Sequence, residues 1–216
     1  MDQQHKETVS MTESAPTESA LWDRYTLTLT VDRLVGGIPA NPKLLDAWLE
    51  ANGAPPEARA EQEAVQAILK DQEVEQHTSA FARDAEGRPC YESRCLKAAF
   101  KEAANILKDT HLGVKNARSK LAEQVFVGPK LVPIRTPIRV DERVIHVMTR
   151  MGPRDSLKRY EVTQDVPLTF EIRTLVGGVF MEKHLRIMVE YLQDGGLGAD
   201  RSQGAGTFPE WQLNRR

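Results

Sequence analysis

The stretch that decides the fold is MEKHLRIMVEYLQDGGLGADRSQGAGTFPEWQL, residues 181–213. The apolar residues of its first half have the i, i+3, i+4, i+7 spacing of one helix face: Leu185, Met188, Val189 and Leu192. Five glycines then lie between Gly195 and Gly206, and the last segment reads as a strand. Because glycine loses the most conformational freedom on ordering, so many in one loop indicate a role beyond turning the chain.

Outside this stretch, the chain alternates between strand and helix patterns. Alternation of apolar and polar residues predicts a strand over 24–36, and a helical period predicts a helix over 93–109, whose apolar face includes Leu96 and Phe100. Further strands are expected over 124–134, over 137–148 with a turn at Asp141–Glu142, and over 165–176. The segments 78–93, 111–120 and 150–161 are predicted as loops, the last two of them basic.

The order of these elements predicts the fold class. With a helical insertion over 40–92 set aside, the core reads β-α-β-β-α-β, which is the ferredoxin-like order. We therefore expect an α+β, ferredoxin-like (RRM-like) fold in a single domain over 21–216. The polar residues 1–20 are predicted to form a disordered tail.

The charges are unevenly distributed along the chain. Residues 1–93 hold 8 basic and 17 acidic side chains, residues 94–160 hold 15 and 6, and residues 161–216 hold 6 and 8. A basic block of this kind is the electrostatic footprint of a phosphate-bearing partner. The alternative is a solvated surface balanced by the acidic part of the chain.

The composition also restricts where the protein can reside and which cofactors it can bind. No run of 18 apolar residues occurs and the N-terminus lacks an apolar signal core, so we expect a cytoplasmic protein with no membrane partner. Cys90 and Cys95, spaced C-x4-C, are predicted to be reduced structural thiols. No metal-ligand spacing is present, and no cofactor or metal is expected.

Two familiar phosphate-binding motifs are absent. The P-loop string G-x-x-x-x-G-K-[ST] does not occur in the sequence. The dinucleotide fingerprint G-x-G-x-x-G fails because Arg201 stands in place of its third glycine.

The string GLGADRSQGAG, residues 196–206, resembles the C-terminal glycine-rich loop of the RAMP superfamily, the ferredoxin-like RNA-binding proteins of CRISPR effector and processing complexes. The matching residues are Gly196, Leu197, Gly198, Arg201, Ser202, Gly204 and Gly206. The helix with Ser93, Leu96 and Lys97 at its start occupies the place of that family's RNA-facing first helix. The resemblance covers 24–36 and 93–214 and is nearer to backbone-forming subunits than to processing nucleases. It implies a subunit that binds single-stranded RNA, such as a guide RNA, and assembles along it with copies of itself and other subunits.

The predicted RNA-binding residues combine the basic block with the glycine loop. They are Arg94, Lys97, Lys101, Lys115, Arg118, Lys120, Arg150, Arg154, Lys158, Arg159, Gly196, Gly198, Arg201, Ser202 and Gly204. Glycine lets backbone N–H groups approach a phosphate, and an arginine can hold it with two parallel hydrogen bonds. The alternative is that the glycines only pack the loop tightly against the sheet.

The sequence does not predict a catalytic site. His111 in the basic 111–120 segment is the candidate general base if the protein cuts RNA without a metal, and Asp32 is the candidate acid near the first strand. His184 is predicted to be solvated. Two alternatives to RNA binding by a backbone subunit thus stay open: a metal-independent endoribonuclease, and an assembly scaffold that binds no nucleic acid.

Overall fold

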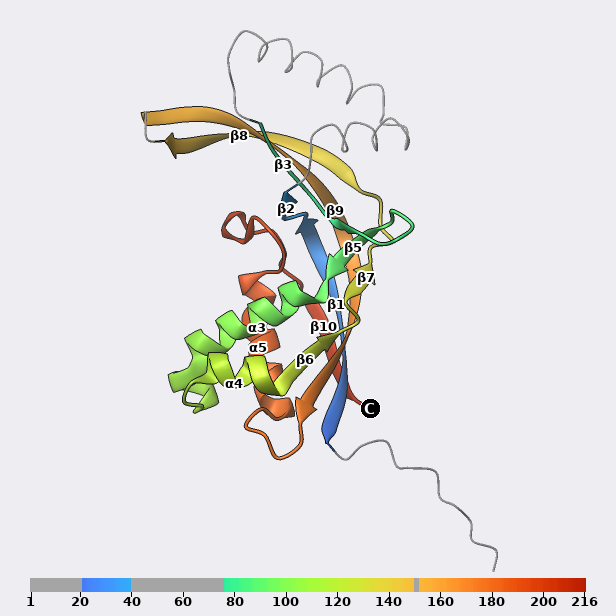
Figure 1. The fold of residues 1–216 in the computed structure, drawn as a ribbon, viewed down its shortest axis with the longest axis vertical. Coiled ribbons are helices and arrows are strands. Elements are labelled where there is room, and N and C mark those ends of the chain that lie inside the picture. Colours follow the sequence, from blue (N-terminus) through green and yellow to red (C-terminus); the bar gives the residue numbers. More distant parts are fainter. Residues whose placement is uncertain (1–20, 40–75, 150–151) are drawn as a thin grey trace, which may run out of the picture.

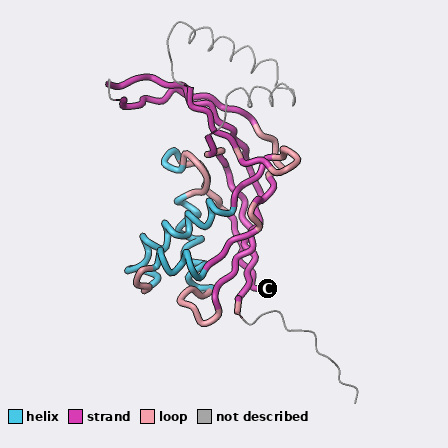
Figure 2. The backbone as a smooth tube through the Cα atoms, viewed as in Figure 1, coloured by secondary structure: helices cyan, strands magenta, loops and turns pink. Residues whose placement is uncertain are grey.

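The computed structural model describes residues 21–39, 76–149 and 152–216 of this chain. Its architecture is α+β: a long, curved sheet with helices gathered against one face (Figures 1 and 2). The α+β prediction is confirmed. Within these ranges, no helix combines the length and the apolar character needed to span a membrane.

The central strand of the sheet is β1 (Trp22–Val35). It runs antiparallel to β10 (Glu210–Arg215) on one side and to β9 (Gly152–Leu175) on the other. β6 (Val125–Gly128) pairs with the opposite edge of β9, so the strands lie in the order β10-β1-β9-β6. Along the chain, the elements of this layer and its helices follow as β1-α3-β6-β9-α5-β10.

The core lies between this sheet and the helices α3 (Ser93–Leu107) and α5 (Glu182–Gly195). Alternate residues of β1 are buried, as the period-two pattern predicts: Tyr25, Leu27, Leu29 and Val31. Leu96 and Phe100 of α3 and Leu185 and Met188 of α5 cover them. Both helices form because their apolar side chains repeat on one face, which this sheet buries.

Beyond the helices, β9 continues as a two-stranded ribbon with β8 (Arg139–Thr149) (Figure 1). The predicted turn at Asp141–Glu142 is wrong, since β8 passes straight through it and pairs with β9 as far as Thr149 opposite Gly152. Residues 152–161 likewise belong to β9 and are not a loop. Because this ribbon extends past the helical layer, Val144 is exposed, and the apolar alternation that marks a strand is lost.

A parallel pairing joins β3 (Gln76–Ala80) to β9, and β2 (Ile38–Pro39) pairs with β3. A second, three-stranded sheet has the order β4-β5-β7, with β4 at Ala82–Arg83, β5 at Pro89–Glu92 and β7 at Leu131–Pro133. The predicted helical insertion 40–92 is therefore wrong for residues 76–92, and the predicted loop 78–93 is wrong where β3, β4 and β5 lie, whereas residues 84–88 do form a turn. Residues 40–75 lie outside the described residues.

The predicted basic loop 111–120 is also wrong in its second half. After α3, the chain forms a π-helical turn at Lys108–Leu112 and then α4 (Ala117–Gln124). Asn116 precedes α4 in a left-handed conformation, and Ala117 and Leu121 are fully buried. Because only two apolar residues anchor this short helix, its sequence carries little helical periodicity.

Candidate nucleic-acid interface

The neck of the glycine loop is formed by backbone segments that meet at its two ends. Gly196 and Gly206 have φ values of +73° and +88°. A Cβ on Gly206 would overlap the carbonyl oxygen of Leu197, and a Cβ on Gly196 would overlap that of Ala205. The N–H of Leu197 donates to the carbonyl of Gly206 at 2.9 Å, and the N–H of Gly206 donates to Arg33 of β1 at 2.7 Å. These two glycines therefore allow the neck to pack closely on itself and on β1.

Three glycine N–H groups of the loop already have carbonyl partners within the protein: Gly196 donates to Leu192, Gly204 to Arg201 and Gly206 to Arg33. These three N–H groups are therefore hydrogen-bonded within the protein. The exposed part of the loop is its tip, where Arg201, Ser202 and Gly204 lie at the surface. A Cβ on Gly204 would meet no atom within 4 Å.

Two ion-pair groups fix the tip of the loop. Asp200, in a left-handed conformation, accepts hydrogen bonds from Lys158 of β9 at 2.6 Å and Arg143 of β8 at 3.2 Å. Both cations lie over the ring of Tyr160, at 5.5 Å and 5.8 Å from its centre. On the other side, Arg201 donates to Glu102 of α3 at 2.8 Å. The tip is therefore held between the β8–β9 ribbon and α3.

Two hollows lie along the exposed face of α3. The first, of about 430 Å³, is bounded by the start of α3, β5 and the glycine loop. The second, of about 340 Å³, lies between α3 and α4. Ala98 and Glu102 border both, so the two hollows lie next to each other along α3. We call the two hollows together the α3 groove, and the charged and amide side chains along it are Glu92, Arg94, Lys101, Glu102, Asn105, Arg118 and Arg201.

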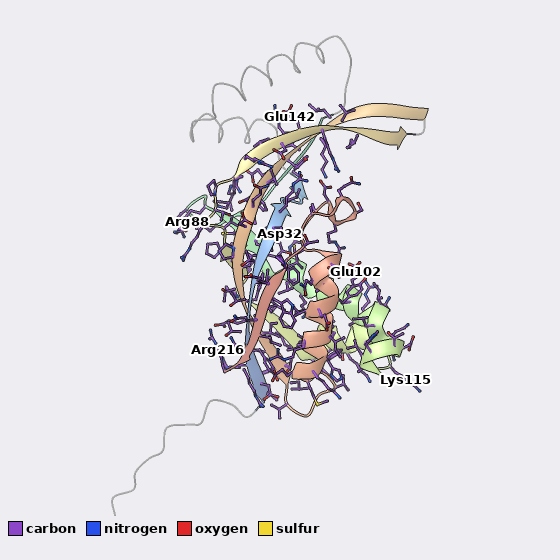
Figure 3. All side chains as sticks on the ribbon, turned by 180° about the vertical axis from the view of Figure 1, so that it is seen from behind. Asp32, Arg88, Glu102, Lys115, Glu142 and Arg216 are labelled. Carbon is purple, nitrogen blue, oxygen red and sulfur yellow. The ribbon has the colours of Figure 1, made fainter. Side chains whose placement is uncertain are left out.

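Four of the predicted RNA-binding cations line this groove: Arg94, Lys101, Arg118 and Arg201. Arg94 is paired with Glu92 at 2.6 Å, and this hydrogen bond raises the pKa of its guanidinium. In Figure 3, Glu102 of α3 lies within the helical layer and Lys115 at its outer end. Gly196 and Gly198 form part of the groove wall.

The other predicted cations whose side chains the structure describes do not line the groove, and two of them, Lys97 and Arg159, are bound to other parts of the protein. Lys97 donates to the carbonyl of Ala122 at 2.9 Å, and burial lowers the pKa of its ammonium. Arg159 is buried and bound to Glu142 at 2.6 Å. Lys115 and Lys120 lie in or next to α4 but do not line the groove. Arg150 lies outside the described residues, and the side chain of Arg154 is not described.

Sequence reasoning missed three side chains of this region: Glu102, Asn105 and Arg143. Glu102 and Asn105 follow Arg94 and Ala98 at helical spacing, so the exposed face of α3 could have been found from its period. Arg143 gave no such signal, because its role depends on the pairing of β8 with β9, which brings it to Asp200.

The catalytic candidates do not converge on one another. His111 is exposed in the turn after α3, with Nδ1 2.8 Å from the hydroxyl of Thr110. Asp32 is exposed on β1, where Thr207 donates to it at 3.4 Å. Among the described residues, no group of three His, Cys, Asp or Glu side chains has metal-binding geometry.

The prediction that His184 is solvated is wrong. His184 is buried at the start of α5, and its Nδ1 accepts a hydrogen bond from the N–H of Met181 at 3.1 Å. Burial, together with the nearby charge of Lys183, lowers its pKa.

Comparison with known proteins identifies a fold and no sequence family. No protein-family profile matches this chain, and no curated protein sequence matches it. Among solved structures, one match is a chain in the cryo-EM structure of the Type III-B Cmr-beta bound to cognate target RNA, at 12% identity and a TM-score of 0.50. The match covers 90% of this chain and 61% of that one. The fold is one found in a Type III-B Cmr-beta structure. This chain spans about three fifths of the length of the chain it matches.

Proposed function

We propose that this protein is a RAMP-like, single-stranded RNA-binding subunit of a cytoplasmic CRISPR-type ribonucleoprotein, and that the strand lies in the α3 groove. One observation carries the proposal. Four cations from three elements border the groove: Arg94 and Lys101 of α3, Arg118 of α4 and Arg201 of the glycine loop. This arrangement occurs in a fold shared with a chain of an RNA-bound complex.

The strand order supports the finer fold assignment. A β-α-β-β-α-β chain whose sheet runs β10-β1-β9-β6 has its last strand beside its first and its third between the first and the second. We infer that this is the ferredoxin-like arrangement of RAMP domains. Both α3 and the glycine loop then belong to the same face of the sheet.

Binding would proceed by exchange of ion pairs. Arg201 and Arg94 are exposed and paired with Glu102 and Glu92, so a phosphate can replace either carboxylate as the hydrogen-bond acceptor. Lys101 and Arg118 add two cations farther along the groove. Contacts of this kind hold the backbone and leave the base sequence unread, which suits a subunit that assembles with copies of itself along one strand.

The first test measures binding of a fluorescent single-stranded RNA by anisotropy as a function of salt. Four phosphate contacts predict a log–log slope of about −3, from roughly −0.7 per phosphate on a single strand. Arg118→Glu is expected to weaken binding about tenfold or more, the range for one hydrogen bond to a charged group. Lys183→Glu is the matched control, because it makes the same charge change at the end of α5 opposite the glycine loop.

The same experiment separates the alternatives. Absence of binding at low salt would overturn the proposal and favour a scaffold. Site-specific RNA products in EDTA that disappear in His111→Ala would favour the endoribonuclease. A single-stranded DNA of the same sequence, run in parallel, distinguishes selectivity for RNA from binding of any single strand.

A further inference from the structure

Glu102 is an accessible carboxylate among the cations of the α3 groove. It borders both hollows, and it accepts a hydrogen bond from Arg201 at 2.8 Å. Glu92 is the other carboxyl group along the groove, but its side chain is only 16% exposed and is bound to Arg94. The side chain of Glu102 is 47% exposed. Of these two carboxylates, Glu102 is therefore the one that a strand in the groove would meet.

Cations stand on both sides of Glu102. Arg94 and Arg201 line the hollow next to the glycine loop, and Lys101 and Arg118 line the hollow between α3 and α4. A strand that occupies both hollows passes Glu102, because this residue borders both of them. Phosphates held by the cations before and after it would bring the sugar that joins them to the carboxylate.

A phosphate that takes Arg201 away from Glu102 leaves this carboxylate without its partner. An ionised carboxylate only accepts hydrogen bonds, and phosphate oxygens accept them as well, so the two groups repel each other. A donor on the ligand can take the place of the arginine, and hydrogen bonds to a charged acceptor are about twice as strong as neutral ones. The groove therefore favours a ligand that brings a hydrogen-bond donor to Glu102.

The ribose 2′-hydroxyl is the donor that fits this position. It belongs to the sugar between two phosphates, and it recurs at every nucleotide of an RNA strand. The donors on base edges, in contrast, differ from one base to the next and lie farther from the phosphates that the cations would hold. The 2′-hydroxyl is also the group by which a protein can distinguish RNA from DNA.

We propose that Glu102 selects RNA over single-stranded DNA by accepting a hydrogen bond from a ribose 2′-hydroxyl. The inference rests on the proposed function and adds to it the residue that determines sugar specificity. In RNA, the hydroxyl replaces Arg201 as the donor to Glu102 while the arginine binds a phosphate. In DNA no donor replaces it, and the carboxylate is left unpaired beside the phosphates.

The test compares the binding of three fluorescent strands of one sequence: RNA, DNA and 2′-fluoro RNA. The 2′-fluoro strand keeps the sugar conformation of RNA but lacks the hydroxyl donor, so it separates hydrogen bonding from strand shape. The parent protein is expected to bind RNA about tenfold or more tightly than either other strand, the range for one hydrogen bond to a charged group. Glu102→Ala is expected to remove this preference, mainly by strengthening the binding of DNA and 2′-fluoro RNA, because the repelling carboxylate is gone.

Two further variants show whether the effect belongs to Glu102. Glu123→Ala makes the same change at an exposed position of α4 that lines neither hollow, and it should keep the preference for RNA. Arg201→Ala should weaken the binding of all three strands by a similar factor and also keep the preference, since the three strands share their phosphates. These variants separate recognition of the sugar from a general change in charge.

The outcomes distinguish the two proposals. Failure of all three strands to bind overturns the proposed function. Equal binding of the three strands by the parent protein overturns the role of Glu102 and leaves the RNA groove intact. A parent protein that prefers RNA over DNA but not over 2′-fluoro RNA recognises strand shape, which also overturns that role. A preference for RNA that persists in Glu102→Ala places sugar recognition elsewhere, with the same consequence.

Discussion

Replacing Gly206 with alanine should destabilise the protein much more than the same change at Gly204. Both glycines have positive φ, +88° and +76°, so alanine costs about 1–2 kcal/mol at either position through backbone strain alone. At Gly204 nothing lies within 4 Å of the added Cβ, and strain is the whole effect. At Gly206 the Cβ overlaps the backbone of Leu197 and forces the neck apart.

Opening the neck removes two hydrogen bonds, Leu197 N–H to Gly206 and Gly206 N–H to Arg33. Each contributes about 0.5–1.5 kcal/mol, so Gly206→Ala should lower the free energy of unfolding by about 2–5 kcal/mol. Urea denaturation followed by circular dichroism measures both variants on one scale. Equal losses for Gly204→Ala and Gly206→Ala would refute the reasoning, because the neck would then not depend on close backbone packing.

Two further predictions concern buried ionisable groups. Glu161 is fully buried and accepts hydrogen bonds from the N–H of Phe81 and from Arg83. Glu161→Gln should therefore lower the free energy of unfolding by about 2–3 kcal/mol in the same urea assay. Glu171→Gln, which changes an exposed carboxyl on the same strand, should leave the free energy of unfolding nearly unchanged. Because burial lowers the pKa of His184 in the folded state, the unfolded chain binds the proton more tightly, and stability should fall as the pH drops below about 6.5, the ordinary value for histidine. Thermal melts between pH 5 and pH 8 check this, and a pH dependence that is the same in His184→Gln would assign the effect to other groups.

The sequence was sufficient to predict the secondary structure of segments that bury one face and expose the other. The alternation in β1 and the helical periods of α3 and α5 are direct consequences of packing against one sheet, and most of the residues predicted to be buried are buried. The exception is Ile106, which the helical period places on the apolar face of α3 and which is 50% exposed. The same reasoning failed in the β8–β9 ribbon and in α4. Neither has a wide apolar face, so the physical cause of a periodic signal is weak or missing there.

The positions of the predicted RNA-binding cations could not be read from the sequence. Arg94, Lys101, Arg118 and Arg201 border the α3 groove, where Arg94 and Arg201 are paired with Glu92 and Glu102, and their binding of RNA stays a prediction. Lys97, Lys158 and Arg159 have the same chemistry in the sequence, yet the fold gives them Ala122, Asp200 and Glu142 as partners. A cation's availability depends on neighbours that are distant in the chain, and no local pattern records them.

In the glycine loop, too, the sequence determined one part of the structure and the tertiary contacts determined another. Its composition alone determined that the chain between α5 and β10 must take conformations closed to other residues, because only glycine adopts positive φ without strain. The tertiary structure decided what those conformations do: Gly196 and Gly206 let two backbone segments and β1 come together, while Gly204 lies in open space at the tip. It also decided that α3, β5 and the loop border one pocket, which Tyr91 helps to line. These contacts join residues as far apart as Arg33 and Gly206, and such contacts exist only once the sheet has formed.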